Sequence, residues 1–123
     1  MPVLNSINQM LNEMTEWRHD LHKIPEIGLE EYETSKYIKN KLKEFGISFK
    51  DGYSNTGLVA WVDGNKKTND KTIGLRADFD ALPMPEKNEF DHKSTNKGMM
   101  HACGHDGHTT CLLYTSPSPR DNR

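Results

Sequence analysis

The sequence has little of what marks a membrane, secreted or nucleic-acid-binding protein. It contains no apolar run of about 18 residues, and residues 1–9 lack the basic start and apolar core of a signal peptide. Sixteen basic and 18 acidic residues leave a net charge of −2, too small to attract nucleic acid. With only Cys103 and Cys111, a single disulfide is arithmetically possible. These absences favour a cytoplasmic protein with neither nucleic-acid nor membrane partners.

At 123 residues the chain has the size of one small domain, and hydrophobic spacing predicts two amphipathic helices in its first part. Pro25 obliges the first helix to end by Lys23 or Ile24. The second covers residues 30–45 and stops at Gly46, which can adopt a left-handed conformation. The apolar stripe of the first helix consists of Ile7, Met10, Leu11, Met14, Trp17 and Leu21.

Short β-like runs follow the helices at residues 47–50, 57–62 and 72–75. The polar residues 63–71 are typical of a turn and predict a hairpin between the second and third runs. Two helices followed by strands and a reactive loop indicate an α/β fold, in which chemistry is presented at strand ends.

The densest group of reactive side chains lies in residues 100–108, with sequence MHACGHDGH. Imidazole, thiolate and carboxylate groups together suit Zn, Mn, Co, Ni or Cu, whereas a soft thiolate argues against Ca or Mg. Gly104 would let Cys103 and His105 turn toward one ion. The alternative is a polar loop in which Cys103 is a small buried hydrophobe and Asp106 caps a helix that begins at residue 108 or 109.

Two further groups could also carry chemistry. Asp78 and Asp80 would share one face of a continuing strand, where they could bind metal or orient a ligand histidine. Alternatively, Asp80 begins a turn and Asp78 pairs with Arg76 or a backbone amide. His19 and His22 have the i, i+3 spacing of a helical metal site, although histidines so placed more often pack or cap a helix end.

Three segments in order and spacing resemble one family: RHDLHKIPEIGLEEYET (residues 18–34), LRADFDALP (75–83) and MHACGHDGHTT (100–110). The family is the aminoacylase and carboxypeptidase-like metallopeptidases, in the amidohydrolase branch with hippurate hydrolases, N-acetyl-diaminopimelate deacetylases and plant auxin-conjugate hydrolases. The resemblance implies the N-terminal part of a zinc-peptidase-like α/β catalytic domain.

By this resemblance Cys103 and His105 are metal ligands and Asp78 is a catalytic residue that orients the site. Arg76 stands where the wider family has a metal-binding histidine, as is usual in this branch. The cofactors implied are divalent ions, two per complete enzyme, drawn from Mn, Zn, Co or Ni. No ligand role is assigned to His101, Asp106 or His108.

The activity implied by the resemblance is hydrolysis of the amide bond of small N-acyl amino acids, by a parent enzyme that forms homodimers. The general base and further ligands of the family lie beyond this sequence, so the resemblance predicts an inactive fragment that binds metal weakly. The alternatives are a dipeptidase or carboxypeptidase of the same family, a small metal-binding module using His101, Cys103 and His105, and an inert α/β fragment.

The end of the chain differs in composition from the rest. Residues 111–121 resemble one reading frame of a common transposon-end sequencing adapter. We therefore expect residues 111–123 to be a non-native, adapter-derived tail without chemistry, and residues 1–110 to be the N-terminal fragment of the catalytic domain.

Overall fold

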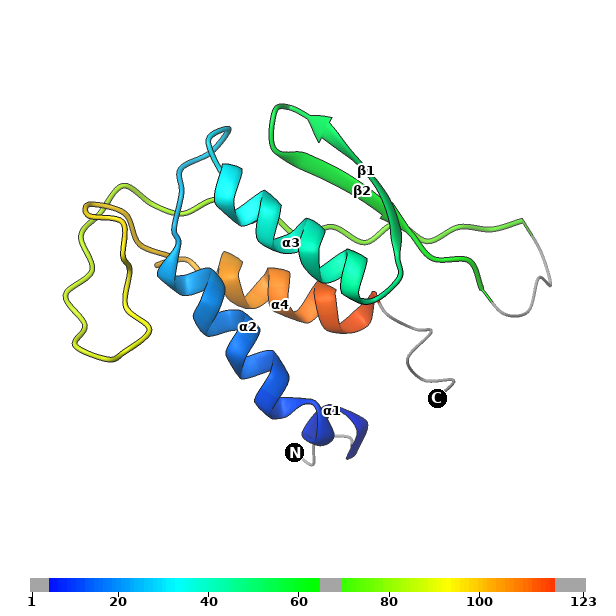
Figure 1. The fold of residues 1–123 in the computed structure, drawn as a ribbon, viewed down its shortest axis with the longest axis horizontal. Helices are drawn as coiled ribbons and strands as arrows, with labels where there is room; N and C mark the ends of the chain where they lie inside the picture. The colour runs from blue at the N-terminus through cyan, green and yellow to red at the C-terminus, as the bar shows by residue number, and fades with distance from the viewer. Residues whose placement is uncertain (1–4, 65–69, 117–123) are drawn as a thin grey trace.

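The computed structural model describes residues 5–64 and 70–116, with three longer helices and one hairpin. Figure 1 shows the three longer helices packed together, and the hairpin lies against one of them. The α/β prediction is confirmed. The elements are α1 (Asn5–Gln9), α2 (Leu11–Lys23), α3 (Tyr32–Glu44), β1 (Ser48–Tyr53), β2 (Gly57–Trp61) and α4 (His105–Thr115).

The first amphipathic stripe forms two helices, where the sequence predicted one. The Met10 amide donates to the carbonyl of Ile7, three residues back, at 3.0 Å. This tighter turn separates α1 from α2. The buried side chains of α2 include Trp17 and Leu21, and the helix ends at Lys23 as predicted.

The second of the two predicted helices is α3, and a carboxylate of the preceding loop caps its first turn. Glu26 accepts hydrogen bonds from the Glu33 amide at 3.1 Å and the Thr34 amide at 2.7 Å, which satisfies two amides of the first turn. Gly46 follows the helix with φ of 70°, the left-handed stop that the sequence predicted.

The hairpin connects different strands from those predicted. β1 pairs antiparallel with β2, and Gly57 opposes Tyr53 beside the turn. A Cβ atom at Gly57 would lie 2.7 Å from the Tyr53 carbonyl oxygen, so the close approach requires glycine.

The predicted hairpin across residues 63–71 is wrong in the described part of the chain. Residues 72–75 form no strand, and Ile73 is 85% exposed without a neighbouring strand to pair with it. Residues 65–69 of that connection lie outside the described residues.

The hydrophobic core joins all three longer helices. Its buried members are Trp17, Ile38, Leu42, Ile47 and Leu113. Leu113 belongs to the predicted adapter-derived tail, of which residues 111–115 form the last turns of α4. Residues 117–123 lie outside the described part, and the foreign origin of the tail stays a prediction.

Two expectations from composition can be compared with the described residues. Cys103 and Cys111 are both free and exposed, so the single disulfide that their number allows is not formed. Within residues 5–64 and 70–116, no helix combines the length and the apolar character needed to cross a membrane.

Candidate metal centre

The start of α4 is set by Gly104. This residue has φ of 101°, a left-handed conformation that glycine adopts at low cost, and the helix begins immediately after it at His105. The predicted start at residue 108 or 109 is therefore wrong. Asp106 lies inside the first turn instead of before it, and its Oδ1 accepts the adjacent Gly107 amide at 2.9 Å.

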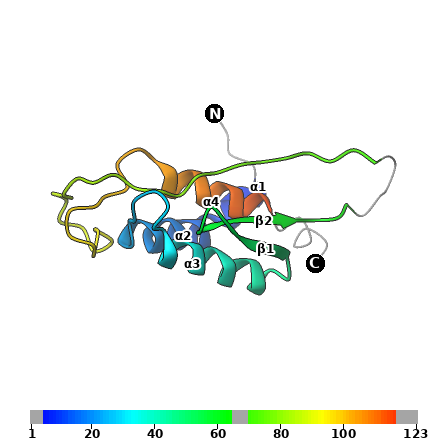
Figure 2. The ribbon, with the colours of Figure 1, turned by 90° about the horizontal axis from the view of Figure 1, so that it is seen from above.

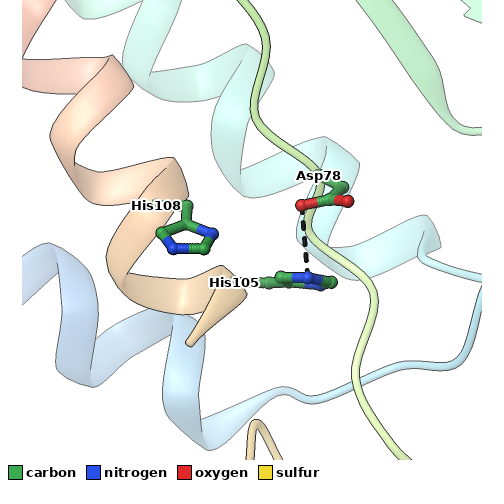
Figure 3. Close-up of side chains that lie close together, drawn as sticks. All are labelled: Asp78, His105 and His108. Atoms are coloured by element: carbon green, nitrogen blue, oxygen red, sulfur yellow. Dashed lines mark ion pairs between the residues drawn. The ribbon is translucent and has the colours of Figure 1, made fainter. Parts of the chain in front are cut away.

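The His105 ring lies against the extended segment that contains both predicted aspartates. Its Nδ1 is 2.9 Å from the Asp80 carbonyl oxygen and 2.9 Å from the Asp80 carboxylate. Since both of these atoms are acceptors, Nδ1 carries the proton. The lone pair of a neutral ring is then on Nε2, which is 3.3 Å from Asp78 Oδ1 (Figure 3). A carboxylate that fixes the tautomer in this way is typical of a metal-binding histidine.

His108 completes a group of three side chains that could hold a metal ion. One ligand atom from each of Asp78, His105 and His108 lies within 4.8 Å of the others (Figure 3). Imidazole and carboxylate are common ligands of Zn, Mn, Co and Ni. The 3.3 Å between Asp78 and His105 is close to the roughly 3.4 Å between two ligands that each lie about 2.1 Å from a tetrahedral ion. The donor set therefore fits a divalent transition metal.

The predicted site residues divide into two groups in the structure. Asp78 and His105 come together, and Asp78 also pairs with Arg76 at 3.6 Å, as the alternative interpretation expected. Cys103 is exposed, so its interpretation as a buried hydrophobe is wrong. Among the described residues it belongs to no group of three metal-binding side chains. Its role as a ligand stays a prediction.

His108 is the member of this group that the sequence left without a role. Its i, i+3 spacing from His105 was the available signal, since such residues share a helix face. That signal could be read only with the correct helix start, because a helix beginning at residue 108 would exclude His105.

The two histidines of α2 lie outside this group of three. His19 stacks on His92 with ring centroids 3.6 Å apart. His22 is buried, with Nδ1 2.8 Å from Asp106 Oδ2 and Nε2 2.9 Å from Glu86 Oε2. Burial opposes ionisation of Asp106, but the bond from His22 and the charge of Arg18 outweigh it and lower the pKa of this carboxyl.

His101 of the third motif is 4% exposed, and neither ring nitrogen has a hydrogen-bond partner among the described residues. Burial lowers the pKa of its imidazole, because a charged ring would lose its hydration. This burial favours the neutral form of His101.

The chain is similar to known hydrolases over most of its length. It is 44% identical over 116 residues to a hippurate hydrolase of Campylobacter jejuni, covering 94% of this chain and 30% of that protein. It is 47% identical over 96 residues to an IAA-amino acid hydrolase of Arabidopsis thaliana, covering 78% and 21%.

Similarity in structure extends over the same part of the chain. A crystal structure of a Bacillus subtilis protein, described as a dinuclear metal-binding peptidase of the M20 family, superposes with a TM-score of 0.84 at 35% identity. The match covers 94% of this chain and 32% of the other. The model of peptidase family M20/M25/M40 matches residues 74–115, which include Asp78, His105 and His108. The residues of the candidate metal centre therefore lie in a segment that matches the M20/M25/M40 peptidase family.

Proposed function

We propose that this chain forms the N-terminal, metal-binding part of an enzyme that hydrolyses the amide bond of N-acyl amino acids. The observation that carries the proposal is the His105 ring, which is held at Nδ1 by Asp80, has Nε2 3.3 Å from Asp78 and forms one group with Asp78 and His108. The names of two relatives, hippurate hydrolase and IAA-amino acid hydrolase, support an amide bond to an amino acid as the target.

Cys103 and His105 are the proposed metal ligands, with Asp78 as the catalytic residue that orients the site. A bound divalent ion, Mn, Zn, Co or Ni, would supply an acidified water and polarise the carbonyl of the substrate. The protein's contribution is to hold the ligands. Asp80 keeps the proton of His105 on Nδ1, and Asp78 lies 3.3 Å from the other nitrogen. Two ions per complete enzyme are proposed, in keeping with the dinuclear neighbour.

The chain spans 30% of the hippurate hydrolase and 32% of the dinuclear peptidase. We therefore assign the general base, the remaining ligands and the dimer contacts of the parent to residues outside this sequence. The isolated chain should bind metal weakly and show no hydrolysis above background, because one thiolate and one imidazole do not complete a hydrolytic site.

The test uses a protein of the relatives' length that carries residues 1–110 of this sequence at its N-terminus. We expect it to hydrolyse hippurate and N-acetyl amino acids with added Mn, Zn or Co. Cys103→Ala and His105→Ala should each lower kcat/KM at least about a hundredfold. Cys111 lies outside residues 1–110 and is absent from the test protein. Full turnover after both substitutions would contradict the proposal.

The second candidate is a dipeptidase of the same family, which the description of the Bacillus subtilis neighbour as a peptidase favours. The same protein assayed against dipeptides separates the two. Faster cleavage of dipeptides than of N-acyl amino acids would replace the first proposal by the second.

A further inference from the structure

His22 joins two segments that are distant in sequence through the two nitrogens of one ring. Nδ1 lies 2.8 Å from Asp106 Oδ2 on α4, and Nε2 lies 2.9 Å from Glu86 Oε2 in the loop before the third motif. The side chains of all three are at most 3% exposed. Each ring nitrogen is within hydrogen-bond distance of a carboxylate oxygen, so the ring cannot rotate without losing a buried contact.

Asp106 transmits this constraint to the metal centre because it follows His105 directly. Successive helical side chains point about 100° apart, so the first turn of α4 is held in two directions. His105 faces the segment of Asp78 and Asp80, while Asp106 faces α2 and also pairs with Arg18 at 3.0 Å. Rotation of α4 about its axis would break both sets of contacts.

Glu86, the carboxylate on the Nε2 side of the ring, is also held in place. Glu86 accepts the Ser94 amide at 2.6 Å and the Asn88 side chain at 2.8 Å. Thr95 of the same loop is tied to the end of α2, where its amide donates to the Lys23 carbonyl at 2.9 Å and its hydroxyl donates to the same oxygen at 2.7 Å. His22 therefore has one anchored carboxylate on each side.

We propose that His22 is a positioning residue, whose bridge between Asp106 and Glu86 sets the orientation of the first turn of α4 and thereby of His105 and His108. The inference rests on the proposed function, since it treats this turn as the metal-binding element. His22 itself touches none of the three side chains of the candidate centre in its hydrogen bonds and ion pairs, and acts through Asp106.

The test compares His22→Gln with Tyr37→Phe in the 123-residue chain. A glutamine amide can reach one of the carboxylates but cannot span both. Tyr37→Phe removes a 2.8 Å hydrogen bond from Tyr37 Oη to Asp20, also on α2, and is the matched control for general destabilisation. Cobalt(II) absorption titration measures the metal affinity, and amide hydrogen exchange measures the order of α4.

We expect His22→Gln to weaken cobalt binding about tenfold and Tyr37→Phe to leave it within about twofold. Exchange should rise at the His108 amide, which bonds the Gly104 carbonyl in the first turn, and not at the Ser116 amide at the end of α4. Equal cobalt affinity and equal exchange in the two variants would overturn the inference.

Glu86→Ala keeps the test decisive if His22→Gln does not fold. It removes the anchor beyond the ring and leaves the bond from His22 to Asp106 in place. Weaker cobalt binding and faster exchange at His108 than in Tyr37→Phe are expected, and their absence would overturn the bridge. A wild-type chain that binds no cobalt contradicts the proposed metal centre, whereas unchanged exchange at His108 contradicts the positioning role.

Discussion

At the start of α4, neighbouring residues have different roles. His105 faces the candidate metal centre, and the buried Asp106 pairs with His22 and with the partly exposed Arg18. The motif around Gly104 made His105 recognisable from sequence, because family ligands lie at a fixed spacing there. The partner of Asp106 was not recognisable, since His22 lies 84 positions away and no local pattern connects the two.

At this scale the acid stability of the protein should depend on Glu86. Burial opposes its ionisation, but hydrogen bonds from Asn88, His22 and Ser94 outweigh it and lower the pKa from 4.5 to about 2. A lowered pKa means that the ionised group stabilises the fold above about pH 4.5 and loses this effect as the pH falls toward 2. Glu86→Gln should therefore be less stable than wild type at pH 6, by a difference that shrinks below pH 4.5.

Urea unfolding at pH 6 and pH 3 measures this difference. Asp51→Asn is the control, because Asp51 pairs with Lys39 at an exposed position, where an ion pair contributes little to stability. If Glu86→Gln lowers the free energy of unfolding by the same amount at both pH values, the pKa of Glu86 does not differ between the folded and unfolded states, which would contradict the prediction.

At the scale of elements, the helices were easier to predict than the strands. α3 was predicted within two residues at each end because its apolar spacing and Gly46 agree. The hairpin was assigned to the wrong pair of runs, since strand pairing depends on contacts across the chain that spacing does not reveal. Ser54 and Asn55 form the turn with positive φ, a conformation favoured by Asn more than by Ser.

Replacing two glycines at the start of α4 by alanine should change the stability of the protein in opposite directions. Gly104 has φ of 101°, so Gly104→Ala should destabilise the protein by about 1–2 kcal/mol through backbone strain alone, because a Cβ there meets nothing within 4 Å. Gly107 lies within α4 and its Cβ would also meet nothing within 4 Å, so Gly107→Ala should stabilise by about 0.5–1 kcal/mol.

Thermal unfolding of the two variants checks both signs in one experiment. Equal shifts of Tm in the same direction would mean that the left-handed start of α4 at Gly104 is not maintained in solution.

At the scale of the whole molecule, the extended residues 70–83 decide where the candidate centre forms. They run beside α4 (Figure 2), where the Asp78 carbonyl accepts the Thr109 hydroxyl at 3.1 Å. Asp78 and Asp80 thus reach His105 through tertiary packing. The sequence could name these residues through family resemblance, but the group they form with His108 required the three-dimensional arrangement.

The central claim is that His105 binds a divalent metal at the start of α4. Cobalt(II) absorption titration of the wild-type chain, His105→Ala and His19→Ala tests it most directly, since His19 is a histidine of α2 outside the candidate centre. We predict weak, saturable binding with ligand-field bands in the wild type and His19→Ala, and their loss in His105→Ala. Undiminished binding by His105→Ala would contradict the account.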